Sequence, residues 1–486
     1  MPSMKNNSST ERQLDRRMWL RSAGHGLASI ALSAILKPRL FAKTERGYPR
    51  AVSGLPHHPP RAKRVIFLTQ SGAPSQLDLF DHKPELKKWR GDEFPESVRM
   101  GQRLTTMTAD QTSKPIAPSP FQFGQHGDCG AMISELLPHT ASVADELCIV
   151  RSMYTEAINH DPAMTLLQTG TQFSGHPSMG SWVSYGLGNE TDELPTFVVM
   201  FSGGEPGDQP ISARLWGSAF LPSEHQGVRF RSGSEPVLYL SNPPGIDSQS
   251  RRASLDTLQK LNRRHYEDRQ DPETLARIAQ FELAFRMQTA VPQLANLADE
   301  PTSTFELYGE EARQPGSYAA NCLLARRLIE KGVRFVELFH RGWDHHERIV
   351  SRLKRKCEQT DRASAALVKD LRQRGLLDDT LIVWAGEFGR TVFCQGDYSA
   401  DSYGRDHHPR CFSIWLAGGG VKRGLTYGRT DEFSYQIEEN PVHVHDLQAT
   451  MLHLLGVDHQ LLTVRYQGRD QRLTDIGGKV VAGILQ

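Results

Sequence analysis

Two segments in the C-terminal half of the chain combine histidines with an acid. The first is Trp343–His346, with the sequence Trp-Asp-His-His, and the second is Gly404–Pro409, with the sequence Gly-Arg-Asp-His-His-Pro. Neutral imidazole and carboxylate groups are ligands that zinc-type divalent cations favour. A third segment, Leu381–Thr391, lies between them and follows its apolar run with Glu387 and Arg390. Together the three segments predict one metal-centred site assembled from distant parts of the chain.

Asp344 and His346 are the predicted ligands of the first segment. In an extended chain alternate side chains share one face, so these two residues can reach the same ion while His345 points away. The alternative is a solvent-exposed turn in which Asp344 caps a helix.

Glu387 and Arg390 form the polar end of the middle segment. The Glu387 carboxylate is a candidate metal ligand, and the Arg390 guanidinium is a candidate clamp for an anionic oxygen. An ion pair between the two residues, or capping of the next helix, explains the same pattern.

The second histidine-rich segment offers His407 and His408. Adjacent residues of an extended chain face opposite sides, so one of them is the predicted ligand and the other supports it. The sequence does not separate the two. His443 and Asp446 precede a stretch of helical periodicity, where helix capping is the predicted role of Asp446.

Six short apolar runs predict buried β-strands. They are Val65–Thr69, Leu147–Val150, Thr196–Met200, Gly332–Leu338, Leu381–Trp384 and Phe412–Leu416. Helical patterns separate most of them, at 134–146, 273–287 and, most clearly, 352–374. This alternation predicts an α/β fold with a mainly parallel sheet sandwiched between helices. Ligands collect beyond the carboxyl ends of the strands in such sheets, which is where the polar segments are expected to meet.

Composition limits the class of partner. Lysine and arginine total 57 against 56 aspartates and glutamates, for a formal net charge of +1, so no global field favours nucleic acid. The 486 residues suffice to bury a large core. Six cysteines without a CxxC pair argue against thiolate zinc, and mostly buried free thiols are favoured over disulfides.

The N-terminal segment differs in kind from the rest. Asp15–Arg21 resembles a twin-arginine export signal, and the apolar run Leu27–Leu36 follows it. Ten helical residues span about 15 Å, half of a ~30 Å bilayer core, so the run fits a signal and not a membrane span. An amphipathic helix of a cytosolic protein is the alternative. We predict an export signal at 1–42, a linker at 43–62 and one α/β domain at 63–486. The expected location is the periplasm or cell envelope, with no membrane span after signal removal.

Several motifs resemble those of a known family. They are Ser71-Gly72-x-Pro74-Ser75-Gln76, Trp343-Asp344-x-His346, Gly386–Thr391 and Asp406–Pro409. Through them the chain, from Arg61 to its end, is similar to the domain-of-unknown-function family 1501, which is placed in the alkaline phosphatase/sulfatase superfamily. In addition, Pro162, Thr169 and Gly170 match the spacing of the sulfatase nucleophile motif.

The resemblance implies hydrolysis of phosphate or sulfate esters, but two positions depart from the superfamily pattern. Where the superfamily has a metal-binding Asp after the first strand, this sequence has Ser71-Gly72, and the nearest acids are Asp78 and Asp81. The nucleophile position holds His160 in place of Ser, Thr or Cys. His160 is therefore expected to act as the base for an attacking water, with covalent nucleophile and additional metal ligand as alternatives.

The predicted function is an exported metal-dependent hydrolase that cleaves a phosphate or sulfate ester of a small molecule or polysaccharide, with water as the nucleophile. Its predicted catalytic residues are His160 and Arg390. The predicted ligands of the divalent ion (zinc, calcium or manganese) are Asp78, Asp344, His346, Glu387, His407 and His408. The alternative is a non-catalytic exported protein that keeps the fold for metal binding or surface assembly. An oxidoreductase is disfavoured, because the glycines at 203–204 and 418–420 lack GxGxxG spacing.

Overall fold

The computed structural model describes residues 51–486 apart from 205–207, 232–235, 239, 298 and 399–401. The predicted export signal and the first part of the predicted linker lie outside the described residues. None of the helices in the described part of the chain combines the length and the apolar composition that a bilayer span requires. All six cysteines are free thiols, and five of them are buried.

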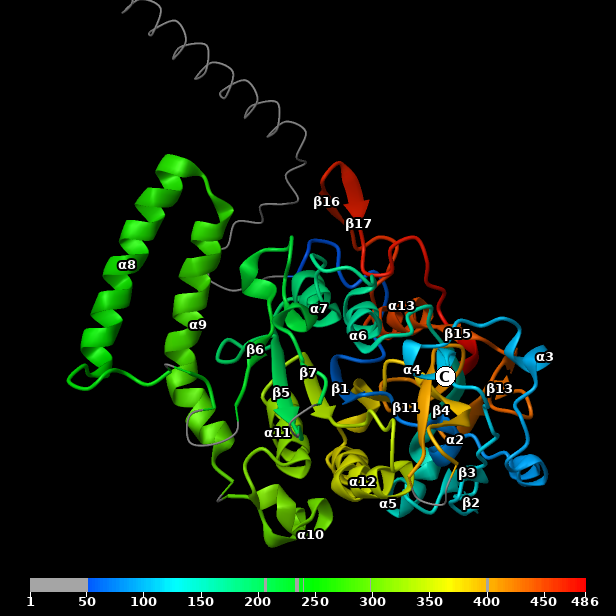
Figure 1. Ribbon diagram of the computed structural model, residues 1–486. Coiled ribbons are helices and arrows are strands. Elements are labelled where there is room, and N and C mark those ends of the chain that lie inside the picture. The colour runs from blue at the N-terminus through cyan, green and yellow to red at the C-terminus, as the bar shows by residue number, and fades with distance from the viewer. Residues whose placement is uncertain (1–50, 205–207, 232–235, 239, 298, 399–401) are drawn as a thin grey trace, which may run out of the picture. The chain divides into compact units, whose positions relative to one another are not determined.

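One large sheet organises this part of the chain (Figure 1). Within the described residues its nine strands have the order β12-β4-β11-β8-β1-β7-β5-β6, with β15 beside β4. The strands are β1 (Arg64–Ser71), β4 (Leu147–Tyr154), β5 (Phe197–Ser202), β6 (Val228–Arg229), β7 (Phe335–Arg341), β8 (Thr380–Ala385), β11 (Phe412–Ala417), β12 (Leu425–Tyr427) and β15 (Val442–His443). Neighbours pair in parallel, except that β11 runs antiparallel to both β4 and β8. The predicted α/β class with a mainly parallel sheet is confirmed, and each of the six predicted runs overlaps one of these strands.

Helices cover both faces of the sheet (Figure 1). One core joins the sheet to α9 (Pro272–Ala295), α10 (Thr302–Tyr308), α11 (Tyr318–Glu330) and α12 (Ile349–Gln373). The other joins it to α6 (His160–Thr169), α7 (Met179–Leu187) and α13 (Val444–Leu454). Alternate residues of β1 serve the two cores, since Ile66 and Leu68 pack in the first and Val65 and Phe67 in the second. This alternation explains why the strand reads as a continuous apolar run.

Smaller elements complete the described chain. α8 (Ser248–Arg269) packs along α9. The two-stranded sheets are β2 (Phe123–His126) with β3 (Ala131–Ser134), β9 (Gly389–Gln395) with β10 (Gly404–His408), β13 (Arg429–Thr430) with β14 (Ile437–Glu439), and β16 (Val464–Tyr466) with β17 (Arg469–Gln471). The short helices are α2 (Gln76–Leu79), α3 (Glu96–Arg99), α4 (Thr106–Ala109) and α5 (Pro138–Ala141).

Two of the three predicted helices are confirmed. α9 covers the predicted segment 273–287, and α12 covers nearly all of 352–374. The prediction of one continuous helix at 134–146 is wrong, because β3 occupies its first residue and the helical residues are divided between α5 and a single 3₁₀ turn at Ala144–Glu146. The predicted capping role of Asp446 is confirmed, since its carboxylate accepts the His443 backbone N–H at 2.9 Å in a capping box.

The direction of β11 decides where β10 lies. The carboxyl ends of the parallel strands β1, β7 and β8 meet at one edge of the sheet. Because β11 runs the opposite way, it begins at that edge, and β10 immediately precedes it in the chain. The segment Gly404–His408 is thereby placed beside the segments that follow β7 and β8.

Two glycines allow the backbones at this edge to touch. A Cβ at Gly72, whose φ is +111°, would lie 2.5 Å from the backbone nitrogen of Asp344. A Cβ at Gly404 would lie 2.0 Å from the carbonyl carbon of His346. Any larger residue would push these segments apart, so both glycines set the distance between the ends of β1, β7 and β10.

Glu337 of β7 places a carboxyl group inside the core. It accepts hydrogen bonds from Gln168 Nε2 at 3.0 Å and from the Thr69 hydroxyl. Its other oxygen has no hydrogen-bond partner within the described residues. Burial raises the pKa of Glu337 to about 8, so the group is mostly protonated in the folded protein at neutral pH.

We expect Glu337 to make the free energy of unfolding fall as the pH rises. In the unfolded chain the carboxyl ionises near pH ~4.3, whereas the folded protein holds its proton up to about pH 8. The free energy of unfolding falls by about 1.4 kcal/mol for each pH unit between these two values, and it levels off above them. Thermal unfolding should therefore show Glu337→Gln gaining stability over the wild type at about pH 8.5 but not at about pH 5. Exposed Glu267→Gln is the control, and identical pH profiles for Glu337→Gln and the wild type would contradict the prediction.

Candidate metal centre

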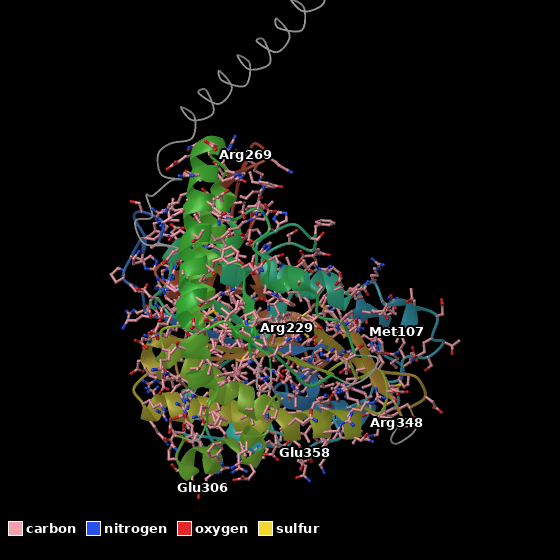
Figure 2. The ribbon with its side chains drawn as sticks, turned by 90° about the vertical axis from the view of Figure 1, so that its left-hand side faces the viewer. Met107, Arg229, Arg269, Glu306, Arg348 and Glu358 are labelled. Atoms are coloured by element: carbon pink, nitrogen blue, oxygen red, sulfur yellow. The ribbon has the colours of Figure 1, made fainter. Side chains whose placement is uncertain are left out.

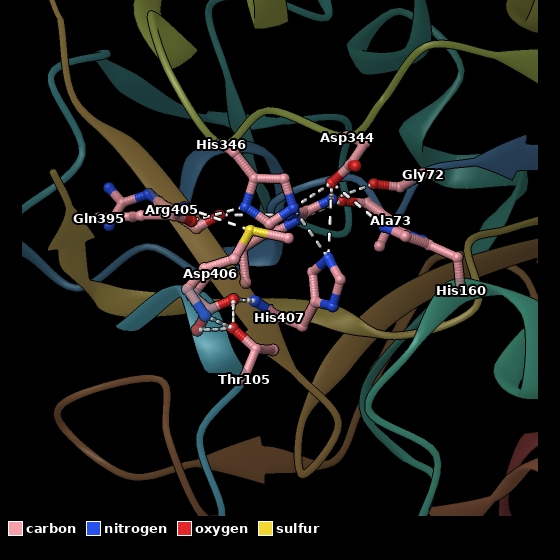
Figure 3. Close-up of polar contacts among 12 residues, drawn as sticks. Gly72, Ala73, Thr105, His160, Asp344, His346, Gln395, Arg405, Asp406 and His407 are labelled. Carbon is pink, nitrogen blue, oxygen red and sulfur yellow. Dashed lines mark hydrogen bonds and ion pairs between the residues drawn. The ribbon is translucent and has the colours of Figure 1, made fainter. Parts of the chain in front are cut away.

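Four side chains from three segments converge at the carboxyl edge of the sheet (Figure 3). His160 begins α6, Asp344 and His346 follow β7, and His407 lies in β10. One ligand atom from each lies within 4.8 Å of the other three. Asp344 Oδ1 is 2.8 Å from Nε2 of His346, 3.1 Å from that of His160 and 3.5 Å from that of His407. The residues thus share one small volume.

Each of the three imidazoles is fixed through its second nitrogen. An oxygen acceptor contacts every Nδ1, which favours the neutral tautomer with its hydrogen on that atom. In this tautomer the lone pair is on Nε2, the atom that faces the cluster. The contacts are His160 Nδ1 to Glu387 Oε1 at 2.6 Å, His346 Nδ1 to Gln395 Oε1 at 2.5 Å and His407 Nδ1 to the Ile158 carbonyl at 2.7 Å. This is the arrangement that metal-ligating histidines adopt in proteins.

The spacing of the ligand atoms fits a bound cation. His346 Nε2 and His407 Nε2 are 3.0 Å apart, and two lone pairs at that separation repel each other unless a proton or a cation lies between them. Ligand atoms bonded to one zinc-type ion at about 2.0–2.1 Å lie roughly 3.3 Å apart in a tetrahedral site. The separations from Asp344 Oδ1, between 2.8 and 3.5 Å, bracket that value. Donor types and distances therefore both suit a divalent cation.

The charges at the site also favour a cation. Asp344 and Glu387 bring two carboxylates, and the guanidinium of Arg390 offsets one of them. Burial alone would raise the pKa of Asp344, but Arg390 and the three histidines hold it far below its ordinary value. Burial alone would lower the pKa of His160, but hydrogen bonds with Asp344 and Glu387 raise it. Burial lowers the pKa of His407 to about 4, so its imidazole stays neutral and able to bind metal.

The guanidinium of Arg390 forms its hydrogen bonds with other groups of the protein. Its side chain is 1% exposed. Nε donates to the Ala73 carbonyl at 2.9 Å, Nη1 to the Arg405 carbonyl at 3.1 Å, and Nη2 to the Gly72 carbonyl and, at 2.7 Å, to Asp344 Oδ1. These contacts correct the predicted role of Arg390 as a clamp for a substrate anion. Arg390 instead ties β1, β10 and Asp344 together.

Asp78 lies away from the cluster, which corrects its prediction as a metal ligand. Its carboxylate pairs with Arg405, Oδ2 with Nε at 2.8 Å and Oδ1 with Nη2 at 3.2 Å. It also accepts the Ser75 hydroxyl at 2.6 Å. Both charged partners are buried, so separating Asp78 from Arg405 to bind an ion would leave a guanidinium without its counter-charge.

His408 is the supporting member of the histidine pair and not a ligand, which corrects its place among the predicted ligands. Its Nε2 contacts the Tyr435 carbonyl at 2.8 Å, and its Nδ1 contacts Gln102 Nε2 at 3.2 Å. The ring stacks on Tyr435 with centroids 4.1 Å apart. Both nitrogens are therefore occupied on the side away from the cluster.

Glu387 contacts the nitrogen of His160 that faces away from the cluster, and it is not one of the four converging residues, which corrects its prediction as a metal ligand. Besides His160 Nδ1, it accepts the backbone N–H of Gly72 at 3.0 Å, and it is fully buried. Sequence reasoning missed Gln395 and the Ile158 carbonyl, which orient His346 and His407. A glutamine at the end of a strand has no distinguishing signal, and a backbone carbonyl leaves none in a sequence.

Comparison with known proteins gives a family and weak structural likenesses. A family model described as "Protein of unknown function (DUF1501)" matches residues 62–485. No curated protein shows significant similarity to the chain.

Solved structures resemble the chain only distantly. The lipoteichoic acid synthase LtaP from Listeria monocytogenes is 9% identical, with a TM-score of 0.31, over 82% of this chain and 72% of that one. A protein in the alkaline phosphatase superfamily from Vibrio parahaemolyticus is 11% identical, with a TM-score of 0.35, over 85% and 71%. The PsFucS1 sulfatase from Pseudoalteromonas sp. is 14% identical, with a TM-score of 0.33, over 82% and 69%.

Proposed function

We propose that this chain, which belongs to the DUF1501 family of proteins of unknown function, is a metal-dependent hydrolase of phosphate or sulfate esters. One observation carries the proposal. Three imidazole Nε2 atoms and one carboxylate oxygen face a common point, and each imidazole is oriented by an acceptor at Nδ1. Such a donor set suits zinc or manganese better than calcium, which prefers oxygen ligands.

In this proposal some side chains are metal ligands and one is the general base. Asp344, His346 and His407 would hold a divalent cation, which would polarise the ester oxygen and lower the pKa of a water. His160 Nε2 removes the proton of the attacking water, while Glu387 keeps Nδ1–H in place and stabilises the charge that His160 gains. Arg390 keeps Asp344 in position.

The partner of each histidine supports this division. Gln395 and the Ile158 carbonyl, which contact His346 and His407, are neutral acceptors. Glu387, which contacts His160, is a carboxylate. An anionic partner stabilises an imidazolium, as a general base requires. A catalytic site also keeps one coordination position open, which three protein ligands allow.

A second candidate function follows if His160 completes the coordination. Its Nε2 is 3.1 Å from Asp344 Oδ1, within the range of the other ligand atoms. Four protein ligands would close a tetrahedral site, as structural metal sites do. The protein would then be a non-catalytic metal-binding or surface-assembly protein.

We also propose export of the protein. The twin-arginine-like segment at 15–21 and the apolar run at 27–36 support this. The division into a signal at 1–42, a linker at 43–62 and a domain at 63–486 is part of the proposal, as is a small-molecule or polysaccharide ester as substrate.

The test is a metal-dependence assay on chromogenic esters. Purified protein is expected to contain about one divalent ion per chain and to cleave 4-nitrophenyl phosphate or 4-nitrophenyl sulfate. Chelation should remove both the ion and the turnover, and added Zn²⁺ or Mn²⁺ should restore them. Bound metal without turnover on either ester would favour the second candidate. A protein that binds no metal would refute both.

A further inference from the structure

A groove of about 540 Å³ lies beside the His407 side of the metal centre. Its walls include Gln102 and Arg103, the segment 154–158, and Pro409 and Arg410. The segment 154–158 leads directly to His160, and Pro409 directly follows His408. The Ile158 residue that lines the groove is the one whose carbonyl holds His407 Nδ1 at 2.7 Å. The loops that position the ligands are therefore also the walls of the groove.

Two arginines in the groove lack a counter-charge. Arg103 and Arg410 are exposed, and neither forms an ion pair or a hydrogen bond with any residue that the structure describes. Glu156, the acid of the same walls, is engaged by His443 Nε2 at 2.8 Å. That hydrogen bond is the main cause that lowers the pKa of Glu156 to about 2. Glu156 therefore keeps its negative charge, and the groove carries two unpaired guanidinium groups against this one carboxylate.

We infer that this groove binds a second anionic group of the substrate, which makes the substrate a polyanion: a phosphate or sulfate ester on a scaffold with further phosphate or sulfate groups. The inference rests on the proposed function. Guanidinium groups bind oxyanions through paired N–H donors. Arg390 is turned to backbone carbonyls and Asp344, whereas Arg103 and Arg410 in the groove remain free to do so. Two such groups along a groove suit a chain better than a single small anion.

Binding to model polyanions tests the inference without any need for turnover. The full-length protein is titrated with fluorescein-labelled dextran sulfate and with labelled polyphosphate, and neutral dextran serves as the blank. Wild-type binding should be salt-sensitive, and Arg103→Gln/Arg410→Gln should weaken it by about tenfold or more. A preference between the two polymers identifies sulfate or phosphate as the group recognised.

The matched control is Arg263→Gln/Arg264→Gln. It removes the same two charges from exposed positions of α8. Figure 2 marks the end of α8 with Arg269, far from Met107 near the metal centre. The control should bind like the wild type. Equal losses in both double variants would reveal non-specific attraction and overturn the inference, as would a wild type that binds neither polymer.

The outcome also separates this inference from the proposed function. Chelation should abolish ester cleavage and leave polyanion binding in place. Polyanion binding without cleavage would refute the hydrolase but keep the groove, whereas cleavage without polyanion binding would refute the groove alone. On a polyanionic ester the groove variant should raise KM with little effect on kcat, because the arginines contact groups remote from the bond that breaks.

Discussion

Replacing His346 with alanine is expected to weaken metal binding by more than about 100-fold and to remove metal-dependent turnover, because one of the three protein ligands is lost. His346 is the best ligand for this test. Its side chain is 17% exposed, and its Nδ1 contacts only Gln395. Its loss therefore leaves no buried charge and little cavity. Metal content by mass spectrometry and affinity by chelator competition are the measurements.

A graded series makes the result specific. Gln395→Leu removes the acceptor at His346 Nδ1 and should weaken binding by roughly 10–100-fold, the range for outer partners of a ligand. Gln395→Glu keeps an acceptor and should stay close to the wild type. His453→Ala, a partly buried histidine of α13 outside the cluster, is the control. Unchanged metal affinity in His346→Ala would refute the metal centre as described.

Replacing His160 with asparagine is expected to reduce kcat by about 10²–10⁴ while the bound metal stays, which is the loss that follows removal of a general base. The metal stays because Asp344, His346 and His407 still hold it. Glu387→Gln should give a smaller loss of kcat, because it keeps an acceptor for His160 Nδ1 but removes the charge that stabilises the protonated ring. Steady-state kinetics and metal analysis of the same preparations are the measurements.

The metal content of the His160 variant decides between the two candidate functions. Loss of metal comparable to that in His346→Ala would make His160 a fourth ligand and the site closed. Retention of both metal and turnover would remove His160 from the mechanism. The thermal unfolding midpoint should be compared with that of the wild type, because His160 is buried and contacts two carboxylates.

Local sequence patterns were sufficient for part of the site. Asp344 and His346 reach one point because alternate side chains of an extended segment share a face, and this spacing is visible in the sequence. The α/β fold was likewise predictable, because strands buried on both faces are continuous apolar runs. Neither inference depends on residues far away in the chain.

Other parts of the site depend on contacts between distant segments. A register shift between Arg405 and His407 in β10, together with Gln102 and Tyr435, decides that His407 and not His408 faces the cluster. Asp78 was predicted as a ligand because it is near the end of the first strand. In the structure it forms an ion pair with Arg405, which is 327 positions away in the sequence. No local pattern in the sequence encodes such pairings.

The reversed direction of β11 would tie uptake of the proposed ion to the completion of folding. If β11 were parallel to its neighbours, it would begin at the opposite edge of the sheet. Its six residues span about 20 Å, so His407, which precedes it, would lie about that far from the other ligands. The ligand set is therefore complete only after β11 has inserted between β4 and β8, a non-local event that is slow to form. In the proposed metal-bound protein, release of the ion on heating would therefore be an early sign that this strand has detached.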